Sequence, residues 1–106
     1  MHKAVILLTR RAGLSRDDFR DWWLNEHRPL AERLPGLRRH AFNLLPEGAP
    51  YDAVVEQWFE TLTDLQTCYE TPHGEAVVAD SRANISARVR LLAEEHTFDT
   101  ATAARG

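Results

Sequence analysis

The chain has 106 residues, which is enough for one domain with one hydrophobic core. The formal net charge is −3 at pH 7, and this acidic balance argues against a general nucleic-acid-binding protein, which usually carries a basic surplus. No apolar run approaches the roughly 18 residues that a membrane span needs, so no membrane association is expected.

The N-terminal part of the sequence predicts a strand followed by a long helix. Residues Lys3–Thr9 are aliphatic and partly β-branched, as in a buried strand. Ser15 is placed to cap a helix that extends to Leu34. Pro29 inside this stretch predicts a kink or break near Arg28, because proline lacks an N–H and its ring clashes with the preceding turn.

One stripe of this helix is apolar except for His27. Its members, spaced three or four residues apart, are Phe19, Trp23, His27, Leu30 and Leu34. A histidine on a buried face must be hydrogen-bonded or must face a cavity in which something else satisfies it. His27 is therefore either a core residue that fixes the helix on the sheet, or a general acid or base in a pocket, since imidazole titrates near neutral pH.

The rest of the chain predicts three more strands and two more helices. In chain order these are the strands Leu37–Leu45 and Tyr51–Glu60, the helices Thr61–Glu70 and Pro72–Ser86, and the strand Val89–Phe98. In the second of these helices the residues expected to be buried are Ala76, Val77, Ala79 and Ile85.

The order β-α-β-β-α-β predicts a ferredoxin-like α+β fold, with a four-stranded antiparallel sheet and helices on one face only. The other face still carries apolar side chains, and a second copy of the chain is its simplest cover, so a homodimer is expected. The domain is expected to span residues 1–98. Residues 99–106 have nothing to bury and are expected to form a flexible tail.

Two strand residues join His27 as candidates for chemistry. Glu56 shares a strand face with Val54 and Trp58, where it either orients His27 or forms a structural ion pair facing a dimer partner. His40 is either a second imidazole, which would donate a proton while His27 accepts one, or a partly exposed strand residue.

Several motifs together carry a resemblance to a known family. They are a first strand ending in Arg10, then Leu14-Ser15-x-x-x-Phe19, Trp23-x-x-x-His27-x-Pro29-Leu30, Pro35-Gly36-Leu37, Asp52–Phe59 and Glu94–His96. This pattern, which extends to about Phe98, resembles the EthD-like proteins of the dimeric α+β barrel superfamily.

The resemblance implies a dimer of ferredoxin-like subunits, each with a pocket between sheet and helices. Family members include a muconolactone methylisomerase, polyketide-tailoring dehydratases and cyclases, and a protein of ether-degradation operons. Their chemistry implies proton transfer by side chains, without a metal, flavin or other cofactor. In the isomerase-like members a pocket histidine matches His27, and a pocket tyrosine corresponds to His40.

We therefore expect a cytoplasmic, cofactor-independent enzyme that isomerises, dehydrates or cyclises a small apolar carbonyl compound of aromatic or polyketide-like character. The expected catalytic residues are His27, His40 and Glu56. The expected substrate-binding residues are Trp23, Phe42, Trp58, Tyr69 and His73. The alternatives are a cofactor-free monooxygenase of the same superfamily and a non-catalytic ligand-binding dimer.

Two other kinds of site have little support in the sequence. Two histidines and a carboxylate can hold iron or zinc, but no known ligand spacing supports a metal site here. Cys68 has no basic neighbour in the sequence that would lower its pKa, so it is expected to be a small buried hydrophobe rather than a nucleophile. A single cysteine also excludes an internal disulfide and suits a reducing cytoplasm.

Overall fold

The structure, a computed structural model, describes residues 1–100. Part of the predicted flexible tail, from residue 101 on, therefore lies outside the described residues. The elements in chain order are β1 (His2–Arg10), α1 (Arg16–Asp21), the π-helical turn η1 (Trp22–His27), α2 (Arg28–Ala31), β2 (Leu37–Leu44), β3 (Ala53–Phe59), α3 (Leu62–Thr67), α4 (Pro72–Asn84) and β4 (Ile85–Glu94).

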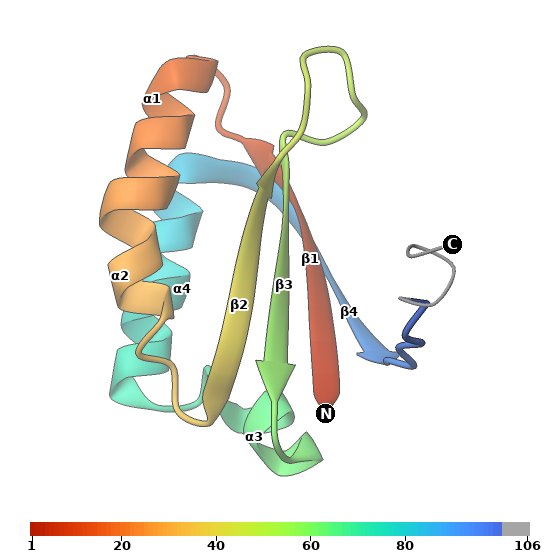
Figure 1. Cartoon of the computed structure of the whole chain (residues 1–106). Coiled ribbons are helices and arrows are strands. Elements are labelled where there is room, and N and C mark those ends of the chain that lie inside the picture. The colour runs from red at the N-terminus through yellow and green to blue at the C-terminus, as the bar shows by residue number, and fades with distance from the viewer. Residues whose placement is uncertain (101–106) are drawn as a thin grey trace.

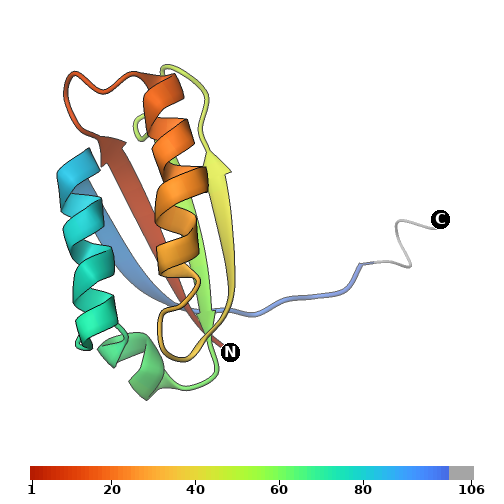
Figure 2. The same cartoon turned by 90° about the vertical axis from the view of Figure 1, so that its left-hand side faces the viewer.

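The four strands form one antiparallel sheet in the order β2-β3-β1-β4. Helices α1, α2 and α4 lie side by side across one face of this sheet, and α3 lies at one end of it (Figures 1 and 2). The predicted ferredoxin-like α+β fold is confirmed. Within residues 1–100 there is no helix with the length and apolar character needed to cross a bilayer.

Strand alternation divides the core from the bare face of the sheet. On β1 and β3 the side chains beneath the helices are Ala4, Ile6, Leu8, Ala53, Val55, Gln57 and Phe59, all of them buried. The side chains between them point to the opposite face. No helix of residues 1–100 covers that face (Figure 1). Gln57 is the one polar member of the inward set on these two strands.

The first helix is continuous through Pro29, so the predicted kink or break near Arg28 is not a break, and the disturbance there is a π-helical turn. The N-cap is the expected one, because Ser15 Oγ accepts the Asp18 N–H at 3.0 Å. The turn before the proline widens into the π-helical segment η1, in which the Arg28 N–H bonds to the Trp23 carbonyl. A π turn adds one residue to the helix, and this allows Trp22, Trp23 and His27 all to be buried.

The last helix and strand differ from their predicted positions. Strand β4 starts at Ile85, directly after α4, and ends at Glu94, so it lies about four residues earlier than expected. The buried face of α4 is built on Gly74 and Val77, whereas Ala76 and Ala79 are exposed. The buried face of α4 therefore differs from the predicted one, and Asp80 and Ser81 point toward the first helix.

Candidate functional site

His27 occupies the interface between the first helix and α4, where its side chain is buried. Its Nδ1 atom lies 2.8 Å from Oδ2 of Asp80. A carboxylate can only accept hydrogen bonds, so Nδ1 carries the hydrogen in this pair. In the neutral ring Nε2 is then left with a free lone pair, which is the form in which imidazole acts as a base.

The Asp80 carboxylate accepts a second hydrogen bond besides the one from His27. The same Oδ2 atom accepts the indole N–H of Trp22 at 3.1 Å, so two donors of the first helix converge on one oxygen of α4. The Trp22 and His27 rings also contact each other, with centroids 4.9 Å apart. This triangle holds the imidazole in one orientation, as an orienting carboxylate does in other histidine-dependent sites.

The other ring nitrogen faces Ser81. The Ser81 hydroxyl lies 3.3 Å from Nε2 of His27, on the residue next to Asp80. Since Nδ1 holds the ring hydrogen, the hydroxyl donates and Nε2 accepts. A long contact of this kind is weak, so a ligand group can replace it at Nε2.

The surroundings of His27 favour its neutral form. Burial lowers the pKa of His27 below its usual value near 6.5, the hydrogen bond and charge of Asp80 oppose that effect, and the nearby charge of Arg88 adds to it. At neutral pH the ring is therefore in its neutral form, with hydrogen on Nδ1 and an Nε2 that is able to accept a proton.

A cavity of about 20 Å³ adjoins His27 between the helices and the sheet, and we call it the inner cavity. Its polar walls come from His27, Gln57, Tyr69, Ser81 and Arg88. Its apolar walls come from Ile6, Leu8, Trp23, Ala31, Phe42, Val55 and Val77. This volume is enough for about one water molecule, so only a small part of a ligand fits there.

A larger space of about 300 Å³ adjoins the inner cavity, and we call it the outer hollow. Tyr69, Ser81 and Arg88 line both spaces. The other walls of the outer hollow are Val78, Arg82, Ile85, Ser86 and Ala87, so it lies between α4 and β4. Its volume is at the lower end of the range for ligand pockets.

Three of the five residues expected to bind substrate line the inner cavity, namely Trp23, Phe42 and Tyr69. Trp23 is fully buried and packs against Phe42, with ring centroids 4.4 Å apart. The Tyr69 hydroxyl accepts a hydrogen bond from Nε2 of Gln57 at 3.2 Å. A polar pair therefore faces the cavity from the side opposite the first helix.

His40 lies on the helix-covered face of β2, directly opposite Gln57 in the strand pairing. Its ring contacts the edge of Phe42, and its Nδ1 is buried without a hydrogen-bond partner among the described residues. It is not one of the walls of the inner cavity, so His27 and His40 do not share one space. Burial lowers the pKa of His40 below its usual value.

Glu56 and Trp58 lie on the bare face of the sheet, away from His27. Glu56 forms an ion pair with Lys3 at 2.7 Å, and Trp58 donates its indole N–H to Glu95 at 2.7 Å. The expected role of Glu56 in orienting His27 is wrong, and so is the place of Trp58 in the pocket. The structure agrees with the other interpretation of Glu56, a structural ion pair on the bare face.

His73 lies at the start of α4, where its Nε2 is 2.7 Å from the backbone carbonyl oxygen of Leu30. This contact ties α4 to α2, and His73 lines neither the inner cavity nor the outer hollow. The structure therefore does not bring His73, one of the residues expected to bind substrate, to either space.

The residues that sequence reasoning missed are Asp80, Ser81, Gln57 and Arg88. Alternation already placed Gln57 on the same strand face as Val55 and Phe59, which marks it as a polar residue among buried ones. Asp80 and Ser81 lie three and four residues after Val77, a spacing that places them on its face of the helix.

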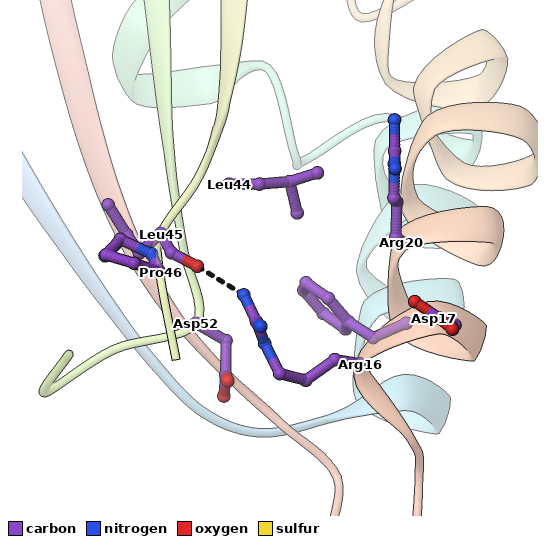
Figure 3. A pocket seen from close by; sticks show the side chains of 8 residues that line it. Arg16, Asp17, Arg20, Leu44, Leu45, Pro46 and Asp52 are labelled. Carbon is purple, nitrogen blue, oxygen red and sulfur yellow. Dashed lines mark hydrogen bonds between the residues drawn. The ribbon is translucent and has the colours of Figure 1, made fainter. Parts of the chain in front are cut away.

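The chain also contains a separate hollow of about 410 Å³, between the start of α1 and the loop after β2 (Figure 3). Arg16 reaches across it and donates to the Leu45 carbonyl at 2.6 Å. Asp17, Arg20 and Asp52 also line it, so its charges are mixed. None of the residues 1–100 that line it is a histidine.

Within residues 1–100, no group of three or more His, Cys, Asp or Glu side chains is arranged to hold a metal ion. The set His27, His40 and Glu56 is divided by the sheet itself. Cys68 is buried in the core beside Phe59 and Leu65, and burial raises the pKa of its thiol. A raised thiol pKa disfavours the nucleophilic thiolate.

Comparison with solved structures identifies the same fold in other proteins. An EthD family protein from Bacillus halodurans C-125 is 22% identical with a TM-score of 0.70, and the match covers 91% of this chain and all of that one. A dimeric protein of unknown function with a ferredoxin-like fold, from Bacteroides fragilis, is 14% identical with a TM-score of 0.70 over 89% of this chain and 95% of that one.

The cofactor-independent oxygenase SnoaB from Streptomyces nogalater is 14% identical with a TM-score of 0.69, covering 92% of this chain and 94% of that chain. No curated protein matches by sequence. The family model of the EthD domain matches residues 11–88, which include the first helix with His27 and the whole of α4 with Asp80 and Ser81. The chain belongs to the EthD domain family.

Proposed function

We propose that this protein is a cofactor-independent enzyme in which His27 moves a proton to and from carbon in a small carbonyl compound. The observation that carries the proposal is the buried His27–Asp80 pair, whose second ring nitrogen is next to a cavity. A structural tie between the first helix and α4 would need only one of the two ring nitrogens. Here Nε2 faces the replaceable hydroxyl of Ser81.

The first step is removal of a proton from the carbon next to the carbonyl group. Nε2 of His27 takes the proton, and the resulting imidazolium is stabilised by the carboxylate of Asp80. The negative charge that develops on the substrate oxygen needs hydrogen-bond donors. The Gln57 amide, the Tyr69 hydroxyl and the Arg88 guanidinium face the same cavity and are suited to that role.

The second step returns the proton from His27 to the substrate. Delivery to a different carbon completes an isomerisation, and delivery to a departing hydroxyl group completes a dehydration. The hydrocarbon of Val78, Ile85 and Ala87 in the outer hollow supports an aromatic or polyketide-like substrate body. The substrate body is placed in the outer hollow, because the inner cavity accepts only the reacting end.

The test uses hydrogen exchange at carbon, which requires no knowledge of the final product. Aromatic β-keto compounds are incubated with the protein in D₂O, and loss of the proton next to the carbonyl is followed by NMR. The expected result is catalysed exchange that falls by about 10²–10⁴-fold in His27→Gln, the usual contribution of a general base. Equal exchange by the two proteins, with folding of the variant checked by circular dichroism, would exclude His27 from the chemistry.

A cofactor-free oxygenase is the second candidate. Its support is the likeness in fold to SnoaB, which is described as a cofactor-independent oxygenase. The same deprotonation would give a carbanion that reacts with O₂ instead of receiving a proton. Oxygen uptake with an anthrone, measured beside the exchange assay, separates the two functions.

The proposed working unit is a homodimer. The bare face of the sheet carries apolar side chains from three strands, among them Leu7, Val54, Val89 and Leu91. Leu91 is 50% exposed and Val89 is 39% exposed in the single chain. A second copy would cover this face, and the Bacteroides fragilis protein of the same fold is described as dimeric.

A further inference from the structure

Arg88 extends from the helix-covered face of β4, where its strand partner on β1 is Leu8. Its guanidinium lies over the ring of Tyr69, 5.0 Å from the ring centroid. Among the ion pairs of residues 1–100, none includes Arg88 or Arg82. A guanidinium without a carboxylate partner keeps its donors available for an anion.

The outer hollow joins these two cations to apolar surface. Of residues 1–100, only Arg82 and Arg88 are charged walls of this hollow, and no carboxylate from that part of the chain lines it. The side chains of Val78, Ile85 and Ala87 supply hydrocarbon on the same walls. A space with cations at one part of its wall and hydrocarbon at another fits an anionic group attached to an apolar body.

Arg88 also determines where the anionic group would lie. Together with Ser81 and Tyr69 it lines both the outer hollow and the inner cavity, so it is at their junction. The Ser81 hydroxyl at this junction is the group that faces Nε2 of His27. A carboxylate held at Arg88 would therefore place its neighbouring carbon atoms next to the base.

We propose that Arg88 is the anion-recognition residue of this site, and that its ligand is an organic carboxylate with an apolar body. Where that ligand is the substrate, the inference rests on the proposed function and narrows the substrate to a carboxylic acid. Recognition follows from the planar guanidinium, which donates two parallel hydrogen bonds to a carboxylate. Arg82 adds positive charge at the outer wall.

The hollow at the start of α1 provides a comparison within the same chain (Figure 3). It also has two arginines, Arg16 and Arg20, but the carboxylates of Asp17 and Asp52 line it as well. Arg16 is bound to the Leu45 carbonyl. Because of these carboxylates it is not expected to select anions, and Arg20→Gln is the matched control for removal of an arginine.

The experiment compares 2-naphthoate with 2-naphthamide, which share a shape and differ in charge. Binding to the full chain is measured by isothermal titration calorimetry, and the site is located from shifts of backbone amide resonances. The expected result is that naphthoate binds at least about tenfold more tightly than naphthamide and shifts the amides of Tyr69 and Ser81. In Arg88→Gln the preference disappears, in Arg88→Lys part of it remains, and in Arg20→Gln it is unchanged.

Three results would overturn the inference. They are equal affinity for acid and amide, a preference that survives in Arg88→Gln, and shifts confined to amides around Arg16 and Arg20. The same calorimetric titration of His27→Gln tests carboxylate binding by Arg88 separately from the proposed catalytic role of His27. Its expected result is an unchanged preference for naphthoate, since Arg88 and not the imidazole holds the carboxylate, and a preference lost in that variant would contradict Arg88 as its source.

Discussion

Oδ2 of Asp80 and Nδ1 of His27 lie 2.8 Å apart, and the two residues belong to different helices, 53 positions apart in the chain. Oδ2 is also the acceptor for the Trp22 indole. The consequence is a histidine whose tautomer is set by its partner and whose second nitrogen is left for other chemistry. The stability and the proposed activity of the protein both depend on this contact.

Replacing Asp80 with Asn is expected to lower the pKa of His27 further. Asp80 opposes the effect of burial through its hydrogen bond and its charge, and asparagine keeps the shape of the side chain without the charge. The measurement is an NMR titration of the His27 ring protons. Glu56→Gln is the control, because Glu56 is on the opposite face of the sheet, and an unchanged His27 titration in Asp80→Asn would contradict the account.

Folding stability is expected to fall as the pH is lowered from about 7.5 to about 5.5. The pKa of His27 is lower in the folded chain than in the unfolded one, so the unfolded chain binds more protons in this range. The neutral ring therefore contributes its stability above the unfolded pKa, and this is lost as the pH falls through the folded pKa. His40 acts in the same direction because burial lowers its pKa too.

Denaturant midpoints at the two ends of this pH range test the effect. The slope of stability against pH is expected to be shallower in His27→Gln than in the wild-type chain, and shallower again when His40→Gln is added. A wild-type stability that is flat or rises as the pH falls would show that these rings are not held neutral.

Removing the hydroxyl of Ser81 is expected to have little effect on the proposed exchange reaction. Its contact with Nε2 of His27 is long, and the proposal has the ligand replace it. Ser81→Ala should lower the free energy of unfolding by about 0.5–1.5 kcal/mol, the usual net value of one hydrogen bond. If the exchange rate in Ser81→Ala fell as far as in His27→Gln, Ser81 would instead take a direct part in the chemistry.

A charge on the bare face of the sheet is expected to separate the proposed dimer. Leu91 lies on that face, and its neighbour Leu92, 53% exposed, lies on the helix-covered side of the same strand. Leu91→Lys should give a monomer in analytical ultracentrifugation, whereas Leu92→Lys should leave the dimer intact. A wild-type chain that sediments as a monomer, or equal behaviour of the two variants, would exclude this face as the interface.

The fold could be predicted from the sequence because each helix and strand is marked by a local sequence pattern. Alternation in Ala53–Phe59, the cap at Ser15 and the periodic stripe through Trp23 and His27 each reflect the geometry of one element. The π-helical turn could not be predicted from the sequence. Pro29 indicates that the helix is disturbed, but it does not decide between a break and an inserted residue.

Only part of the site could be predicted from the sequence, because local patterns do not show how the elements pack against one another. Alternation correctly separated Glu56 from Gln57, yet a strand alone does not show which of its faces the helices cover, and the wrong carboxylate was assigned to His27. Asp80 was missed because α4 is rich in alanine and has charged residues on several sides, so its periodicity does not single out one face. The partner of His27 becomes visible only when the two helices are placed together.

The most direct test of the account is the tautomer of His27, measured by NMR of its ring ¹⁵N nuclei at neutral pH. The expected spectrum shows hydrogen on Nδ1, facing Asp80, and an unprotonated Nε2 next to the inner cavity. Hydrogen on Nε2 in the neutral ring, or a ring that is doubly protonated at neutral pH, would contradict the assignment of His27 as the base.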